Sequence, residues 1–169
     1  MINEARHFAI MAHWGQMYGK KPYLYHLQKV VDNVTTFAES WSLSKIQNDL
    51  QIRRALAWLH DVVEDTDVTI EKISQEFDEE IAGLVSLLTN LLTYDPDACE
   101  FKPDKEKTYQ RIQTNRHAVF VKLCDRLANV SEGEKNDKYR KEHSLFKEIL
   151  YKEGEFENLW SAIHEQLYG

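Results

Sequence analysis

Residues 51–66 read QIRRALAWLHDVVEDT, and their apolar side chains occupy nearly every side of a helical wheel. Apolar residues all around a helix are typical of one that is buried on every side. We therefore predict that residues 51–65 form a central helix against which the rest of the chain packs. The apolar positions are Ala55, Leu56, Ala57, Trp58, Leu59, Val62 and Val63.

The ionisable residues that interrupt this apolar segment are His60, Asp61, Glu64 and Asp65. At 100° per residue they lie within an arc of about 140° on the predicted helix. Burying such groups is costly unless they have partners or hold a metal ion. An amphipathic helix with a solvated polar side is the alternative, but the flanking apolar residues leave no wide face for solvent. The segment therefore predicts a buried polar site.

The sequence on both sides of this segment also has a helical pattern. Six Gly and three Pro leave little room for the many turns of an all-β fold. Thr69 and Asp78 are expected N-caps, each followed by acidic residues that suit the start of a helix. We predict an all-α fold with one long loop at residues 93–104. The other predicted helices cover about residues 5–12, 22–37, 69–76, 78–92, 105–113 and 116–130, with two amphipathic segments between 137 and 167.

Length and composition predict one folded domain over residues 1–169, with a core at about 4–130 and C-terminal helices at about 137–168. The net charge of −7 argues against a nucleic-acid partner, which requires a positive face, but not against a small anionic ligand. No apolar run approaches the ~20 residues of a membrane span. The N-terminus lacks the features of a signal peptide, so we expect a cytoplasmic protein with reduced Cys99 and Cys124.

Two further polar residues occupy apolar helical contexts. His26 lies in PYLYHLQKV, where a hydrogen-bonded core histidine is the alternative to a ligand. Asp125 lies in VFVKLCDRLANV, where an ion pair with Lys122 or Arg126 is the alternative. Together with the central histidine and aspartate, they form a mixed nitrogen and oxygen set. Such a set suits a divalent transition metal such as Mn, Fe, Co or Zn.

Other polar residues are candidates for roles around such a metal. Asn129, one helical turn beyond Asp125, could orient that carboxylate or touch a ligand phosphate, a solvent-facing Asn being the alternative. Glu64 is the candidate general base for an attacking water, and Asp65 the candidate group that positions water. Cations would offset phosphate charge, and the candidates are Lys20, Lys21, Lys107, Arg111 and Lys122.

The segments AHWGQ (12–16), PYLYH (22–26), LHDVVEDT (59–66) and VKLCDRLANV (121–130) follow one another in the order of a known family. The chain resembles the HD-domain hydrolases of the Rel/SpoT type, which remove the 3′-pyrophosphate of (p)ppGpp. It is most similar to their small single-domain members, including the metazoan SpoT homologues. The resemblance covers about residues 4–130 and implies an HD-domain helical bundle with a metal site between its central helices.

This resemblance also implies roles for individual residues. The implied metal ligands, usually for Mn²⁺, are His26, His60, Asp61 and Asp125. Glu64 and Asp65 match the acidic pair implicated in activating the attacking water, and Asn129 matches a residue of the active-site pocket. The implied reaction converts a small nucleotide partner, guanosine-3′,5′-bis(diphosphate) or its pppGpp form, to GDP or GTP and pyrophosphate.

The sequence departs from the family after Gln16, where an Arg-Lys pair usually follows and the Arg helps to hold the guanine base. Here residues 17–21 read MYGKK, without Arg. Tyr18 could stack on any base, and Lys20 or Lys21 could reach a phosphate. We therefore expect weaker base discrimination than is usual in the family.

Two other functions stay open at this point. One is a phosphatase on the same scaffold that acts on another nucleotide, such as NADPH or ppApp. The other is a catalytically inactive HD domain that senses a nucleotide, although an inactive site would have no need for six such polar residues. The oligomeric state is open as well, because Leu159 and Trp160 in the last helix serve either as a subunit contact or as core packing.

Overall fold

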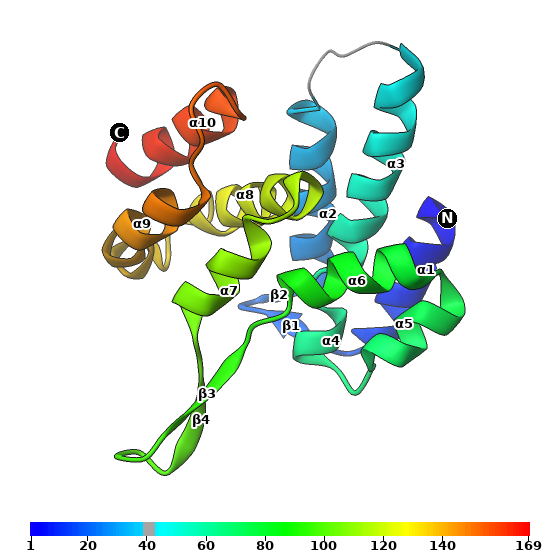
Figure 1. Cartoon of the computed structure of the whole chain (residues 1–169), viewed down its shortest axis with the longest axis horizontal. Helices are drawn as coiled ribbons and strands as arrows, with labels where there is room; N and C mark the ends of the chain where they lie inside the picture. The colour runs from blue at the N-terminus through cyan, green and yellow to red at the C-terminus, as the bar shows by residue number, and fades with distance from the viewer. Residues whose placement is uncertain (39–42) are drawn as a thin grey trace.

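The computed structural model describes residues 1–38 and 43–169, and side chains from residue 48 onward after that gap. The described chain is mostly helical, so the prediction of an all-α fold is confirmed (Figure 1). The helices are α1 (Ile2–Ala12), α2 (Tyr23–Thr36), α3 (Leu43–Leu59), α4 (Val62–Asp65), α5 (Ile70–Glu76), α6 (Glu79–Leu88), α7 (Lys105–Ile112), α8 (Arg116–Val130), α9 (Asn136–Leu150) and α10 (Glu157–Tyr168). Short antiparallel pairs are formed by β1 (Met17–Tyr18) with β2 (Lys21–Pro22) and by β3 (Leu92–Asp95) with β4 (Glu100–Pro103).

The centre of the molecule is built by α2, α3 and α8. Helices α2 and α3 pack side by side, and α8 crosses both of them (Figure 1). The positions at which these helices face one another are apolar and fully buried. Examples are Leu27 on α2, Leu56 on α3 and Leu123 on α8. Helices α1 and α6 cover α3, and α10 covers α8. The polar residues of the central segments therefore lie where three helices meet.

The prediction of one continuous central helix to Asp65 is wrong. Helix α3 ends at Leu59, His60 and Asp61 form a turn, and the short helix α4 follows. The His60 ring bonds through Nδ1 to the carbonyl oxygen of Ala57 at 2.8 Å. That carbonyl is the acceptor that the backbone N–H of Asp61 would use in an uninterrupted helix. The imidazole thus helps to end the helix at the residue that carries it.

The predicted loop at residues 93–104 is also wrong, because β3 and β4 form a hairpin that projects from the helical body (Figure 1). Its two prolines stand at the edges of the pairing, where a missing N–H does not interrupt the ladder. The Tyr94 and Phe101 rings meet across the strands at 5.3 Å, and Lys102 forms an ion pair with Asp95 at 2.7 Å. These cross-strand contacts stabilise the pairing.

The predictions for two helix starts and for the packing of the last helix agree better with the structure. Thr69 and Asp78 are N-caps, as predicted, and accept hydrogen bonds from backbone amides in the first turns of α5 and α6. Helix α6 ends at Leu88, a few residues earlier than predicted. Leu159 and Trp160 are buried, so the core-packing interpretation of these two residues holds in the chain by itself.

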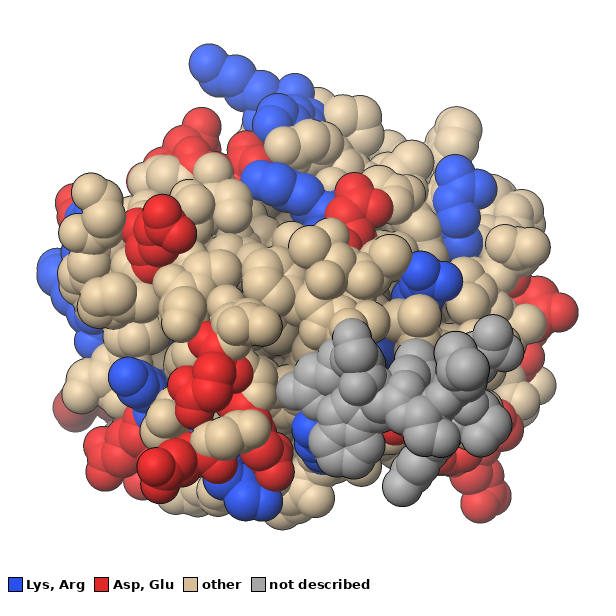
Figure 2. All heavy atoms as spheres, turned by 90° about the horizontal axis from the view of Figure 1, so that it is seen from above, with Lys and Arg blue, Asp and Glu red and all other residues tan. Residues whose placement is uncertain are grey.

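Charge is distributed without one dominant sign on the face seen from above. Figure 2 shows Lys, Arg, Asp and Glu mainly around the periphery of this face, with uncharged surface between them. Within the described part of the chain, no helix combines the length and apolar character that crossing a bilayer would require.

Candidate metal centre

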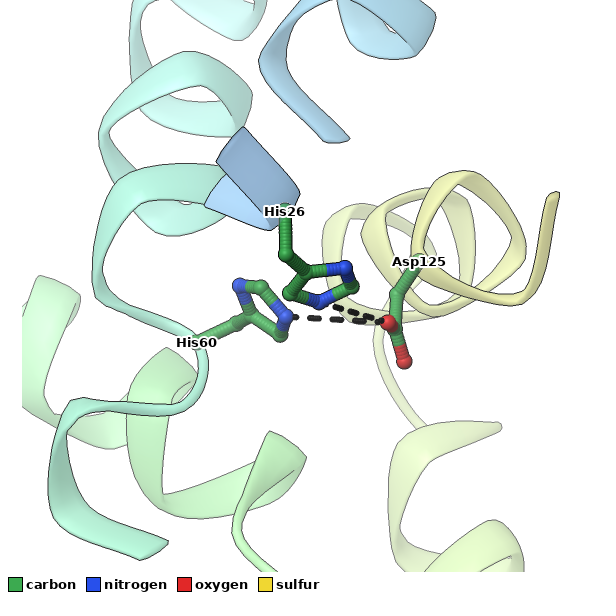
Figure 3. Close-up of side chains that lie close together, drawn as sticks. All are labelled: His26, His60 and Asp125. Atoms are coloured by element: carbon green, nitrogen blue, oxygen red, sulfur yellow. Dashed lines mark ion pairs between the residues drawn. The ribbon is translucent and has the colours of Figure 1, made fainter. Parts of the chain in front are cut away.

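Three elements bring His26, His60 and Asp125 together. His26 comes from α2, His60 from the turn after α3, and Asp125 from α8, and their side chains point toward one another (Figure 3). One ligand-type atom from each lies within 4.8 Å of the other two. Asp125 Oδ1 is 3.3 Å from His26 Nε2 and 3.7 Å from His60 Nε2. All three residues are buried.

Asp61 adds a second carboxylate to this group. Its Oδ2 lies 3.0 Å from His60 Nε2 and 3.4 Å from His26 Nε2. The Tyr23 hydroxyl donates a hydrogen bond to the same oxygen at 2.7 Å. The structure thus brings together all four side chains that the sequence singled out as a metal-ligating set.

The donor set fits a divalent metal. The hydrogen bond between His60 Nδ1 and the Ala57 carbonyl turns Nε2 inward, as is usual for histidine ligands. Although His60 Nε2 is buried, it has no partner in hydrogen-bonding geometry within the described chain. A buried imidazole nitrogen without such a partner, facing two carboxylates, is suited to hold a cation.

The alternative partner of Asp125 is also present. Lys122 Nζ lies 2.9 Å from Asp125 Oδ2, while Asn129 Nδ2 donates to Oδ1 at 2.6 Å. The ion pair with Lys122 therefore uses the oxygen that faces away from the imidazoles, and Oδ1 stays directed at His26 and His60. Asp125 serves both contacts at once.

The electrostatics of the site favour positive charge on its nitrogens. Burial alone lowers the pKa of an imidazole, but the Asp61 and Asp125 carboxylates raise the pKa of His60 to about 10 and also raise that of His26. Conversely, burial opposes ionisation of Asp125, yet Lys122 and the two imidazoles hold its pKa well below the ordinary range. The two carboxylates therefore favour positive charge between the imidazoles, and a bound metal would compete with protons for this position.

Glu64 and Asp65 stand beside the cluster and are open to solvent. Both nitrogens of Asn90, the backbone amide and the side-chain amide, donate hydrogen bonds to the two oxygens of Glu64. Loss of water around its carboxyl raises the pKa of Glu64 above the ordinary value. The Tyr23 hydroxyl is also within hydrogen-bonding distance of Asp65, so its single O–H proton is shared between the Asp61 and Asp65 carboxylates.

Residues of the AHWGQ segment contact Asp65 and Tyr23. His13 Nδ1 bonds to Gln16 Oε1 at 2.7 Å, and Gln16 Nε2 donates to the carbonyl oxygen of Asp65 at 2.7 Å. The His13 ring stacks on Tyr23 with 4.4 Å between centroids and 3° between planes. Sequence reasoning missed Tyr23 as a site residue. Its position three residues before His26, nearly one helical turn away on α2, was the available signal.

A cleft of about 450 Å³ opens over the cluster. The cations that line it are Lys105, Lys122, Arg126, Lys135 and Lys138. Lys105 belongs to α7, Lys122 and Arg126 to α8, and Lys138 to α9, while Lys135 directly precedes α9. Of the five, only Lys122 was predicted to bind an anion. Tyr109 and Tyr139 add aromatic walls. The lining of the cleft thus combines a metal-type cluster with several cations.

The predicted substrate-binding residues near the β1–β2 turn do reach this region. The Tyr18 hydroxyl donates to Asn129 Oδ1 at 2.6 Å, and its ring stacks on His26 at 4.6 Å. Lys20 and Lys21 line a smaller cavity next to the cleft. Lys21 forms an ion pair with Glu132 at 3.1 Å.

Lys107 and Arg111 are not among the residues that line the cleft. Lys107 forms an ion pair with Asp104 at 3.1 Å, and Arg111 donates to the carbonyl oxygen of Ser86. Helix α7 presents Lys105 and Tyr109, one turn apart, to the cleft. The two predicted residues of this helix therefore lie outside the cleft lining, and their role in substrate binding stays a prediction.

Comparisons with known proteins agree with this arrangement. Residues 5–151 match the family model described as HD domain. The chain is 37% identical over 78 residues to a probable guanosine-3′,5′-bis(diphosphate) 3′-pyrophosphohydrolase of Synechocystis sp., a match covering 45% of this chain and 10% of that protein. It is 31% identical over 133 residues to the guanosine-3′,5′-bis(diphosphate) 3′-pyrophosphohydrolase of Borreliella burgdorferi, covering 77% and 18% respectively. The chain thus spans a tenth to a fifth of the length of these relatives.

A solved structure has the same fold over nearly the whole chain. It is described as a metazoan ortholog of SpoT that hydrolyzes ppGpp and plays a role in starvation responses. The TM-score is 0.71 at 23% identity, and the match covers 98% of this chain and 94% of that one.

Proposed function

The chain belongs to the HD domain family, and we propose that it is a metal-dependent phosphohydrolase that acts as a guanosine-3′,5′-bis(diphosphate) 3′-pyrophosphohydrolase. The observation that carries the proposal is the convergence of two imidazoles and two carboxylates below a cleft lined with cations. The similar proteins of Synechocystis sp. and Borreliella burgdorferi are named for this reaction, which supports this substrate. We further propose that the protein acts in the cytoplasm and that its partner is a small nucleotide.

The proposed ligands for the metal are His26, His60, Asp61 and Asp125, and the proposed metal is Mn²⁺. Two nitrogen and two oxygen donors suit a divalent metal of this class. When bound, the ion supplies Lewis-acid polarisation of a phosphoryl oxygen and neutralises charge that develops there. The inward turn of His60 Nε2, fixed by the Ala57 carbonyl, supports this assignment.

The chain's own acids would direct the attacking water. Glu64, held through both oxygens by Asn90, accepts the proton of a water that adds to the phosphorus on the 3′-oxygen. Asp65, held by Tyr23, positions that water. The bond between this phosphorus and the 3′-oxygen breaks, the 3′-oxygen takes a proton, and pyrophosphate and GDP leave.

Cations of the cleft would bind the phosphate groups. Lys122 stands beside Asp125 with part of its side chain exposed, and Lys105 and Lys138 also line the cleft. Charge-assisted hydrogen bonds from such groups to phosphate are stronger than neutral ones. Two phosphate chains of the substrate require several such cations, which supports a polyphosphorylated nucleotide.

The test is an assay of pyrophosphate release from ppGpp by purified, Mn²⁺-loaded protein. The wild type and the surface control His7→Ala should turn over, whereas His60→Ala should lose both Mn²⁺ and activity. His7 is exposed, which makes its variant a matched control for loss of an imidazole. ppApp and NADPH are assayed in parallel. Turnover of NADPH alone would assign the protein to another nucleotide, and absence of turnover with all three would leave a nucleotide sensor.

A separate prediction concerns the acid pair. Glu64→Gln should keep Mn²⁺ and lower kcat by about 10²- to 10⁴-fold, because the general base is removed. Asp65→Asn should have a smaller effect if this residue only positions water. Calorimetric titration with Mn²⁺ and steady-state kinetics on the same samples check both statements. Loss of Mn²⁺ from Glu64→Gln would identify Glu64 as a ligand instead of a base.

A further inference from the structure

Glu142 on α9 is an acid of the cleft to which the proposed chemistry gives no role. The other acids that line the cleft in the described chain belong to the metal cluster or to the acid pair, and they are Asp61, Glu64, Asp65 and Asp125. A carboxylate on the wall of a cleft for phosphate groups repels them, because both carry negative charge. The contacts of Glu142 show how this charge is balanced.

Glu142 lies between two cations of the cleft, Lys105 on α7 and Arg126 on α8. Its Oε1 accepts a hydrogen bond from Lys105 Nζ, and its Oε2 lies 3.5 Å from Arg126 Nη2. The side chains of Glu142 and Arg126 are 18% and 4% exposed, so water and salt screen this pair less than a pair on the open surface. One carboxylate thus offsets the charge of two cations from two other helices.

The Arg126 guanidinium is held in place but is incompletely paired. Its Cζ lies 4.2 Å from the centre of the Phe146 ring and 4.6 Å from that of Tyr139, and Nη2 donates a hydrogen bond to the Tyr109 hydroxyl at 3.2 Å. Arg126 Nη1 and Glu142 Oε2 are buried without a hydrogen-bond partner in the described part of the chain. The 3.5 Å between Nη2 and Oε2 is longer than a charge-assisted hydrogen bond. Glu142 therefore neutralises this cation without satisfying its hydrogen-bonding groups.

A phosphate group is a stronger partner for these two cations than a carboxylate. It carries up to about two negative charges and three acceptor oxygens, so it can bond to Lys105 and Arg126 together. We propose that Glu142 is a built-in counter-anion, which occupies Lys105 and Arg126 until a phosphate group of the nucleotide displaces it. Glu142 thereby weakens the retention of phosphorylated ligands in the cleft.

The proposal deepens the proposed function and rests on it, because it concerns the phosphate groups of the same substrate. It predicts a gain of affinity where the loss of a binding contact would give the opposite. Replacing Glu142 by Gln removes the competing charge and releases Lys105 and Arg126, so phosphorylated ligands should bind more tightly. If the carboxylate instead held these cations in position for the substrate, the same replacement would weaken binding.

The experiment is calorimetric titration of Mn²⁺-loaded protein with ppGpp. Every protein carries Glu64→Gln, which suppresses turnover, so the ligand stays intact during the titration. Addition of Glu142→Gln should tighten ppGpp binding by about tenfold, the scale of one hydrogen bond to a charged group. Addition of Glu142→Ala should act in the same direction. The control is addition of Glu148→Gln, which removes an exposed acid of the same helix outside the cleft lining and should leave binding within twofold.

A double replacement separates local competition from a general change in charge. With Lys105 replaced by Gln, one of the two cations that Glu142 occupies is gone. Glu142→Gln should then improve ppGpp binding by less than it does in the presence of Lys105. Guanosine, which has no phosphate, should bind to Glu142→Gln as it does to the parent protein.

Weaker or unchanged ppGpp binding in Glu142→Gln would overturn the assignment, as would an equal gain in Glu148→Gln or an undiminished gain without Lys105. These readouts need no turnover. A protein that shows the expected gain, but leaves ppGpp intact when Glu64 is present, would refute the proposed function alone. One that cleaves ppGpp and shows no gain would refute the counter-anion alone, and one that does not bind ppGpp at all would refute both.

Discussion

At the scale of single residues, Asn90 is the contact on which the proposed chemistry depends most directly. Its two nitrogens donate to both oxygens of Glu64, and these hydrogen bonds lower the pKa of a carboxyl that its surroundings otherwise raise. Because a general base acts in its ionised form, removing these donors should make Glu64 harder to ionise. Asn90 therefore sets the pH range in which Glu64 can work.

Asn90→Ala removes the side-chain donor to Glu64 and keeps the backbone amide, so the Glu64 pKa should rise and the acidic limb of the kcat/KM profile should shift to higher pH. At neutral pH, kcat should fall by about tenfold, in line with the loss of a hydrogen bond to a charged group. Steady-state kinetics between pH 5 and 9 measure the shift. Asn33→Ala, which removes an amide from α2 that bonds to the Cys124 carbonyl, is the control for a purely structural loss. An unchanged acidic limb in Asn90→Ala would show that this contact does not tune the base.

The sequence indicated the four members of the cluster because each is a costly polar group in an apolar helical segment. It did not indicate Tyr23, whose hydroxyl reaches Asp61 and Asp65 and whose ring stacks on His13. A tyrosine on a partly apolar helix is ordinary in sequence. Its role depends on which segment folds back over it.

At the scale of elements, periodicity predicted most helices, but local hydrogen bonding decided where they end. The break after Leu59 depends on the His60 ring and its bond to a carbonyl of its own helix, which no apolar pattern records. Lys105 and Lys138 were not predicted to line the cleft, because the apolar pattern does not say which side of α7 and α9 faces it. That side depends on how these two helices pack on each other and on α8.

Helix α8, which carries Asp125, offers a test at this scale. Asn115 is its N-cap, and its side chain accepts hydrogen bonds from the backbone amides of His117 and Ala118. Asn115→Ala should lower the free energy of unfolding by about 1 kcal/mol, while Asn115→Asp should keep most of the stability. Urea denaturation measures both. Equal stability of all three proteins would mean that this cap contributes nothing.

At the scale of the whole molecule, the proposed site joins α2, the α3–α4 turn and α8 through one ion. An ion that binds only the folded protein should raise the free energy of unfolding by about 2.7 kcal/mol at one hundred times its Kd. For a chain of this size, that corresponds to a rise in Tm of roughly 5–10 °C. Differential scanning calorimetry with and without Mn²⁺ measures the rise.

The same scans on His60→Ala should show no rise in Tm with Mn²⁺, whereas His7→Ala should behave as the wild type. A similar rise in His60→Ala would mean that the ion binds elsewhere. The prediction of one domain over residues 1–169 stays a prediction, which a single cooperative transition in these scans would support.

The distribution of the four cluster residues along the chain also has a consequence for the order of events during folding. His26 and Asp125 stand near the two ends of the HD core, so they meet only after a long stretch of chain has been brought together, at a cost in loop-closure entropy. Contacts between such distant residues form late. The apoprotein should therefore fold first and capture its ion afterwards, and an unfolded or nascent chain would compete poorly for a scarce divalent metal. Occupancy of the site would then report on how much metal the cell holds, independently of how fast the protein is made.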